Sequence, residues 1–494
     1  MASEQRKSGL GGDGIWLGIA KLWFLVASYA ITISLTHLLS ADVYGSYYAI
    51  ARLIAVPNMV IIYTLLFSVS RPLAAQYDSG CPDYAALRAR GIKVALGLGG
   101  PTAVVLFLAA PLLADWLADP SLTDAIRVVA PISLVYALYA INLGTLNAVR
   151  QFRRQASLDI AMATSKSVFI IAAAAAGLGL VATVGGFTLA SVFALLLSLA
   201  MVRRVAPRPT APSQPLQSMA SFAGLLVVFT AITNLLQSID MLLLKSFAMA
   251  VEQNEAVGFY ASAQQIALVP YSLMNAVALL AFPLIASIDV EREQAKVRLY
   301  IQQTAKVAIV LLAFMSSVGS ACADEIQALL FPKAYGAAAD ELRLLVWGFS
   351  GYSFAVTVAW ILNSAKRSRA AVLLVTVPLV VVWIAGRVLI PTMFTGGAAW
   401  AVGGAGALAV VTAMIALQRT FSAHIPMLQL LRVGLCVAVV ELAARVWPTV
   451  RAAGMVGKLA IVAKLGVLAV VFIGAALLTK TVTVAELKGL RRGG

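Results

Sequence analysis

Long apolar stretches separated by short polar segments dominate this sequence. A helix of about 20 mostly apolar residues is long enough to cross the hydrocarbon core of a bilayer. Fourteen stretches meet that requirement, and they lie near residues 15–39, 44–70, 92–114, 123–148, 158–178, 181–202, 218–247, 257–287, 301–322, 340–364, 369–390, 397–417, 427–447 and 456–479. Pro57, Pro270 and Pro283 fall inside them, where helices embedded in lipid tolerate kinks. The pattern predicts an all-α integral membrane protein with about 14 transmembrane helices.

The composition strengthens this prediction. The 494 residues are 61% hydrophobic and 12% charged, with a mean hydropathy of +0.92. Soluble domains average about 45–50% apolar and about 25% charged residues. The net charge of +16 comes from short basic bursts between apolar stretches, which is typical of membrane proteins oriented by their loops. We therefore expect no nucleic-acid partner.

The distribution of basic residues predicts the topology, because cytoplasmic loops carry an excess of Lys and Arg. With the N-terminus in the cytoplasm, most basic residues fall in cytoplasmic segments, whereas outer loops carry acids such as Asp115 and Glu252. We expect a multi-pass protein with both termini cytoplasmic. One outer loop, between the last two spans, departs from this rule because it contains the cations Arg445, Arg451 and Lys458. Either the predicted position of this loop is wrong, or the loop contacts anionic lipid.

Two motifs recur in the same order and at nearly the same separation. Leu-Asn before a basic burst occurs at 146–156 and again at 362–371, and V-Y-G-S-Y at 43–47 resembles A-V-G-F-Y at 256–260. Such duplication is a recurring architecture of transporters, with the substrate site between the repeats. The predicted divisions are an N-terminal six-helix lobe (1–205), a cytoplasmic Pro-rich linker (206–217), a C-terminal six-helix lobe (218–420), and a C-terminal helix pair with a cytoplasmic tail (421–494).

The G-x-Y blocks, the closing prolines, the L-N-x-x-[RK] helix ends and the arrangement of six, six and two spans resemble a known family. This is the polysaccharide-transporter branch of the multidrug/oligosaccharidyl-lipid/polysaccharide (MOP) exporter superfamily, which includes O-antigen and exopolysaccharide repeat-unit flippases. The resemblance covers essentially the whole chain. It implies two lobes forming a V-shaped central cavity, with two further C-terminal helices.

The same resemblance implies a secondary transporter of the bacterial inner membrane that works by alternating access. Its cargo is an undecaprenyl-pyrophosphate-linked oligosaccharide, moved to the periplasmic leaflet for lipopolysaccharide or exopolysaccharide biosynthesis. The implied partners are this lipid-linked oligosaccharide, membrane lipids and a coupling ion, either a proton or sodium. A polysaccharide polymerase and a chain-length regulator are further candidate partners.

Two alternatives stay open from the sequence: a small-molecule or multidrug exporter of the same superfamily, and a membrane polysaccharide polymerase. The sequence contains no phosphate-binding loop, nucleophile motif or His–carboxylate cluster, so we expect neither an enzyme nor a bound cofactor or metal. Cys81, Cys322 and Cys436 lie far apart and fit no disulfide or metal spacing.

Charged and polar residues within the spans supply the candidate site. Charged groups in a membrane span usually face a protein interior or a wet cavity, and those found here are Lys21, Arg52, Lys166, Asp240, Lys245, Glu441 and Lys464. The span at 218–247 has one polar sector that contains Thr230, Thr233, Asn234, Gln237, Asp240 and Lys245. The first span carries a narrower stripe of Lys21, Ser28, Thr32 and Thr36. These stripes either line a central cavity or bond neighbouring helices.

Arg52 is the strongest candidate for binding pyrophosphate, because a guanidinium presents a planar, permanently charged fork to phosphate oxygens. The repeat places Gln265 at the equivalent position of the second lobe, and Lys21 and Lys166 would add positive charge. Alternatively, Arg52 pairs with an acid such as Asp240, and Lys21 extends to the cytoplasmic interface.

Asp240 is a deep carboxylate that could bind the coupling proton or sodium ion. Lys245, in the same span, could instead hold Asp240 as an ion pair or contact the substrate with Asn234 and Gln237. Lys464 either pairs with a nearby acid or contacts a lipid headgroup.

Overall fold

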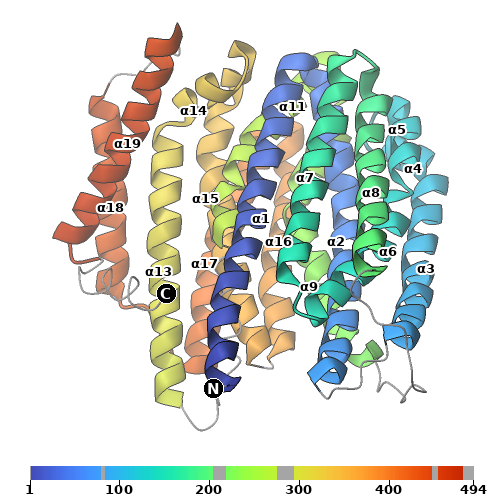
Figure 1. The fold of residues 1–494 in the computed structure, drawn as a ribbon. Coiled ribbons are helices and arrows are strands. Elements are labelled where there is room, and N and C mark those ends of the chain that lie inside the picture. The colour runs from blue at the N-terminus through green and yellow to red at the C-terminus, as the bar shows by residue number, and fades with distance from the viewer. Residues whose placement is uncertain are drawn as a thin grey trace. The chain divides into compact units, whose positions relative to one another are not determined.

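The computed structural model describes residues 2–78, 84–203, 219–274, 294–365, 367–447 and 454–481. Within these ranges every regular element is a helix, as the apolar pattern predicts (Figure 1). The predicted linker at 206–217 and tail beyond residue 481 lie outside the described residues, as do Cys81 and Pro283.

Twelve of the described helices are long and apolar enough to cross a membrane, and a bent pair brings the number to 13. The predicted span near 257–287 begins in helix α11 and runs beyond the described residues. The all-α membrane fold is therefore confirmed, and the predicted count of about 14 agrees with these helices.

The chain forms two compact units, residues 1–258 and 259–494. This division falls inside α11, whereas the predicted lobes are defined by the sequence repeat. The lobe boundaries and the V-shaped arrangement remain predictions.

The helices of the first unit are α1 (Ala2–Leu38), α2 (Ala41–Asp78), α3 (Tyr84–Leu108), α4 (Ala110–Trp116), α5 (Thr123–Val129), α6 (Ile132–Ala148), α7 (Phe152–Ala175), α8 (Gly179–Arg203), α9 (Met219–Leu236), α10 (Ile239–Ser246) and the start of α11 (Val251–Ala267), with a 3-10 turn η1 (Pro120–Leu122). Helix α2 packs on α6 and α9, and α7 packs on α1 and α8. Small residues allow close packing: a Cβ added to Gly99 of α3 would lie 2.6 Å from the Ala137 Cβ of α6.

The second unit contains the end of α11, α13 (Gln294–Ala321), α14 (Ala323–Leu330), the 3-10 turn η2 (Lys333–Ala338), α15 (Ala339–Ser364), α16 (Ser368–Met393), α17 (Thr395–Phe421), α18 (Met427–Val446) and α19 (Gly454–Leu478). Helix α15 packs on α13, α16 and α17. The backbones of α15 and α17 nearly touch. A Cβ added to Gly351 would lie only 2.2 Å from the Gly406 carbonyl oxygen, so the absence of side chains allows this approach.

The C-terminal helix pair packs against α13 within the second unit (Figure 1). Lys464 of α19 resolves the two predicted possibilities for this residue. Its ammonium lies 2.5 Å from the Glu325 carboxylate of α14, and the two side chains are 3% and 2% exposed. Lys464 therefore pairs with an acid rather than with a lipid headgroup. Cys322 and Cys436 are free, buried thiols.

Candidate functional site

The seventh predicted span is broken in the middle of its polar sector. The axes of α9 and α10 differ by 54°. Three side chains bond carbonyl oxygens of their own helix just before or at the break: Asn234 to Thr230 at 2.8 Å, Gln237 to Thr233 at 3.1 Å, and Ser238 to Asn234 at 3.0 Å. Such bonds compete with the regular ladder and bend helices. Part of the polar sector thus forms hydrogen bonds with the backbone of its own helix, although Asn234 and Gln237 stay partly exposed.

The break places Asp240 in the first turn of the short helix α10. The positive end of a helix dipole favours a carboxylate at this position. The side chain is 1% exposed, and its charge interacts with the phenol of Tyr48 on α2. Asp240 is therefore a buried acid at a bend, within reach of the α2 residues described next.

Arg52 lies one helical turn after Tyr48 on α2 and is half-buried. Its guanidinium donates a hydrogen bond to the Tyr48 hydroxyl and lies 4.7 Å from the centre of that ring. Tyr29 of α1 is close enough for its hydroxyl to interact electrostatically with both Tyr48 and Arg52. Sequence reasoning missed both tyrosines, although the spacing of Tyr48 and Arg52 by four residues places them on one helix face.

Lys166 of α7 brings a second cation to this part of the first unit. Its side chain is half-buried, and its Nζ lies 3.9 Å from the centre of the Phe187 ring of α8. The charges of Lys166 and Arg52 repel each other. Like charges in a poorly hydrated place are unfavourable, and a bound anion would relieve the repulsion. The structure thus brings together two of the three predicted pyrophosphate-binding cations.

Lys21 is exposed on α1, and its charge interacts with Asp159 of α7. Asp159 is 7% exposed and accepts a hydrogen bond of 3.4 Å from the Tyr139 hydroxyl. Sequence reasoning missed this acid, which stands at the edge of the predicted span at 158–178, next to a basic burst. Lys21 therefore has an acidic neighbour on α7 and is placed differently from Arg52 and Lys166.

Lys245 lies in a separate polar cluster near the predicted outer ends of the helices. Its ammonium, with a side chain 1% exposed, donates to Asp119 at 3.0 Å, to Ser46 at 3.2 Å and to Asn254 at 2.5 Å. We call these four residues the Lys245 cluster. The structure thus gives Lys245 an acidic partner, Asp119, on a different segment from Asp240. Gln265 is half-buried on α11 in the second unit.

Comparison of the sequence with known protein families gives a match. The sequence profile of the polysaccharide biosynthesis protein family matches residues 92–340. No sequence among the curated proteins matches the chain.

Several solved structures share the fold. The lipid II flippase MurJ, in an inward closed conformation, matches with a TM-score of 0.70 and 14% identity over 93% of this chain and 98% of MurJ. An inward-facing multidrug resistance MATE transporter of the MOP superfamily matches with a TM-score of 0.64 and 14% identity over 82% of this chain and 98% of that one. A MOP superfamily transporter from Pyrococcus furiosus matches with a TM-score of 0.62 and 15% identity over 83% of this chain and 95% of that one.

At these identities the likeness concerns the fold, which agrees with the resemblance found from the sequence motifs. The family profile, in contrast, matches about half of the chain directly. The chain therefore belongs to the polysaccharide biosynthesis protein family and has the fold of MOP superfamily transporters.

Proposed function

We propose that this protein is a flippase for undecaprenyl-pyrophosphate-linked oligosaccharide repeat units. It moves them from the cytoplasmic to the periplasmic leaflet of the bacterial inner membrane, for the biosynthesis of cell-surface polysaccharide. The family match and a fold shared with a lipid II flippase support this proposal. The proposal rests mainly on the placement of two half-buried cations, Arg52 of α2 and Lys166 of α7, on membrane-spanning helices of the first unit, near enough for their charges to interact.

A pyrophosphate suits these two cations. A guanidinium has five N–H donors, so the bond from Arg52 to Tyr48 leaves donors for phosphate oxygens. The stacked Tyr48 ring limits the orientations of that fork, which reduces the entropy lost on binding. Lys166 supplies a second positive charge, and Lys21 adds a third on α1. In this proposal the polar residues Asn234, Gln237 and Gln265 contact the glycan part of the cargo.

Ion coupling belongs to Asp240 in this proposal. A carboxylate that is 1% exposed at a helix break is sensitive to the gain or loss of a proton or sodium ion. Tyr48 connects the two parts of the site, because its phenol interacts with both Asp240 and Arg52. Occupancy of Asp240 would thereby change the field at the pyrophosphate site. Asp240→Asn is expected to abolish the ion dependence of transport and to leave cargo binding in place; unchanged ion dependence would remove Asp240 from this role.

An even number of spans places both termini on the same side of the membrane. The distribution of basic residues indicates that this side is the cytoplasm, and we retain that topology for the proposed flippase. A polysaccharide polymerase and a chain-length regulator would act on the product in the periplasm.

The test is export of surface glycan by a bacterial strain that lacks its own repeat-unit flippase and expresses this chain. Lipid-linked intermediates are assayed by leaflet, and resistance to cationic drugs is measured in the same strain. Restored export with depletion of the cytoplasmic-leaflet intermediate is the expected result. Drug resistance without any change in the intermediate, across several glycan backgrounds, would favour the multidrug exporter.

A further inference from the structure

A basic cavity of about 500 Å³ lies in the second unit, where α13, the connection between α17 and α18, and the start of α18 meet. Four basic side chains line it: Arg298 and Lys306 from α13, His424 from the connection, and Arg432 from α18. Amide side chains, including Gln302 and Gln429, complete the polar lining, and none of its ten lining residues is acidic. The cavity is therefore suited to an anion.

Hydrogen bonds connect the segments around the cavity, although these segments are distant in the sequence. Gln302 of α13 donates to the His424 carbonyl oxygen at 3.3 Å. Arg432 and Gln429 of α18 donate to the backbone carbonyl oxygens of residues 480 and 481, just after α19, at 3.4 Å and 3.0 Å. The ends of α13, α18 and α19 are thus fixed around one place, so the cations converge there through the fold rather than by chance.

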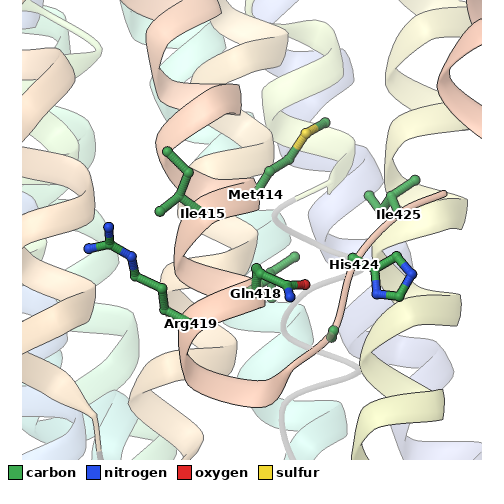
Figure 2. A pocket seen from close by; sticks show the side chains of 8 residues that line it. Met414, Ile415, Gln418, Arg419, His424 and Ile425 are labelled. Atoms are coloured by element: carbon green, nitrogen blue, oxygen red, sulfur yellow. The ribbon is translucent and has the colours of Figure 1, made fainter. Parts of the chain in front are cut away.

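A second cavity of about 580 Å³ lies beside the same connection and shares His424 and Ile425 with the first. Gln418 extends from α17 towards the connection, whereas Arg419 points away from it (Figure 2). His424 therefore borders both cavities, and the depression continues from the basic cavity along α17. Ile415 and Met414 make this continuation more apolar than the basic cavity.

Apolar side chains exposed at the surface begin directly beside the basic cavity. Leu428, which itself lines the cavity, is 58% exposed, and Leu431 and Leu435 on the same helix are 61% and 54% exposed. On α13, Leu299 and Val307 are 56% and 47% exposed. In a membrane-spanning unit these residues face acyl chains, so the cations lie at the border between the hydrocarbon and the headgroup region. Basic cavities between helices at this border suit anionic headgroups.

We infer that this cavity binds the phosphodiester headgroup of an anionic phospholipid, whose acyl chains lie along the exposed leucines of α18. The cytoplasmic leaflet supplies the lipid, because the lining belongs to segments whose basic residues place them on that side. The site belongs entirely to the second unit and uses none of the residues that we assign to the cargo. Loss of this lipid site and failure of the flippase proposal would therefore give different results.

The experiment measures lipid binding to the purified full chain by native mass spectrometry and by thermal unfolding. The probes are dioleoyl-phosphatidylglycerol, the zwitterionic dioleoyl-phosphatidylcholine, and inorganic phosphate. The variant is Arg298→Gln with Arg432→Gln, and the matched control is Arg369→Gln, an exposed cation of α16 outside the cavity lining. Glutamine keeps hydrogen-bond donors, so the bond from Arg432 to the Lys480 carbonyl oxygen has a replacement.

We expect phosphatidylglycerol to bind and to raise the unfolding temperature of the wild-type chain and of Arg369→Gln. Binding to the double variant should be weaker by roughly tenfold or more, because two surface cations are lost. Arg298→Gln alone repeats the test if the double variant does not fold. Equal binding of phosphatidylglycerol to wild type and variant, or equal binding of phosphatidylcholine, would overturn the inference. Stabilisation by inorganic phosphate equal to that by phosphatidylglycerol would identify a free-phosphate site and overturn the lipid assignment.

Discussion

Gly45 and Gly258, which occupy equivalent positions in the two copies of the sequence repeat, lie backbone against backbone. A Cβ on Gly45 would come within 2.8 Å of the Gly258 amide nitrogen, and a Cβ on Gly258 within 1.9 Å of the Ala41 carbonyl oxygen. The backbones at the start of α2 and the start of α11 are therefore in direct contact, with no room for a side chain between them. The recurrence of glycine in both G-x-Y blocks has a physical reason, because any side chain would separate these helices.

Gly258→Ala is accordingly expected to destabilise the protein by about 1–3 kcal/mol or more, since the obstacle is backbone and cannot rotate away. Gly97→Ala on α3 is the matched control, because a Cβ there meets nothing within 4 Å. Alanine favours the helix at such a position by roughly 0.5–1 kcal/mol. Thermal unfolding of both purified variants checks the difference, and equal unfolding temperatures would refute the close crossing.

The Lys245 cluster lies beside this contact, because Ser46 adjoins Gly45 on α2 and Asn254 is on α11. We expect the mutation of Asp119 to destabilise the protein more than the mutation of Lys245. Asp119→Asn leaves the Lys245 ammonium, 1% exposed, without its counter-charge, and should destabilise the protein by about 3–5 kcal/mol. Lys245→Met should be milder, because Asp119 is 22% exposed and keeps a 2.5 Å bond from Ser121. Denaturant or thermal unfolding measures both variants.

The control for this pair is Asp124→Asn in the same segment, where the ion pair with Arg127 is exposed and should be worth less than about 1 kcal/mol. A smaller loss for Asp119→Asn than for Lys245→Met would contradict the assignment of the buried charge.

The pH dependence of stability follows from the same pair. Burial raises the pKa of Asp119, but bonds from Ser121 and the charge of Lys245 outweigh it and hold the pKa below the ordinary 3.8. A carboxyl with a lowered pKa in the folded state stabilises the protein above its unfolded-state pKa, and loses that contribution as the pH falls through the folded-state pKa. Wild type should therefore lose unfolding temperature more steeply than Asp119→Asn below about pH 4. Parallel curves for the two proteins would show that the pair does not titrate in this way.

The buried pair of Glu325 and Lys464 anchors α19 to α14. Lys464→Met leaves the Glu325 carboxylate, 2% exposed, without its cation, and should cost about 3–5 kcal/mol. Combining Lys464→Met with Glu325→Gln should recover most of that loss, because neither charge remains buried. Lys458→Met, at an exposed position of the same helix, serves as the control and should change little. Unfolding of wild type, the two single variants Lys464→Met and Glu325→Gln, and the double variant gives the coupling energy, and additive effects would show that the two residues are not coupled.

Arg52 is expected to act through its planar fork as well as through its charge. Arg52→Ala should abolish glycan export, and Arg52→Lys should restore it only in part, because an ammonium cannot bond two phosphate oxygens in the same geometry. Lys166→Met removes one charge-assisted contact and should weaken cargo binding by about 10–100-fold. Export is measured at matched membrane levels, with Arg90→Ala, an exposed cation, as the control. Full activity of Arg52→Lys would show that charge alone suffices.

The helices were predictable because each depends only on local hydropathy, and no partner elsewhere in the chain is needed to satisfy its backbone in lipid. The break between α9 and α10 was not predictable in this way. The polar sector keeps its helical period across the break, and the bend depends on whether Asn234 and Ser238 bond the backbone or a neighbour.

Ion pairs between residues distant in the sequence could not be predicted either. Lys464 and Glu325 are 139 residues apart, and Lys245 and Asp119 are 126 residues apart, so only the fold reveals these pairs. Local pairs were within reach: Tyr48 precedes Arg52 by one helical turn, and Asp159 is a visible acid within a predicted span. The candidate site was thus predictable as a set of cations, but not as an arrangement.

The most direct test of the account is the rate at which reconstituted protein moves a fluorescent undecaprenyl-pyrophosphate-linked oligosaccharide between the leaflets of a proteoliposome. Wild type, a variant combining Arg52→Ala with Lys166→Met, and protein-free vesicles are compared, with folding verified by thermal unfolding. We expect rapid movement by wild type, and movement by the double variant no faster than in protein-free vesicles. Wild type that matches protein-free vesicles, or a folded double variant that matches wild type, would contradict it.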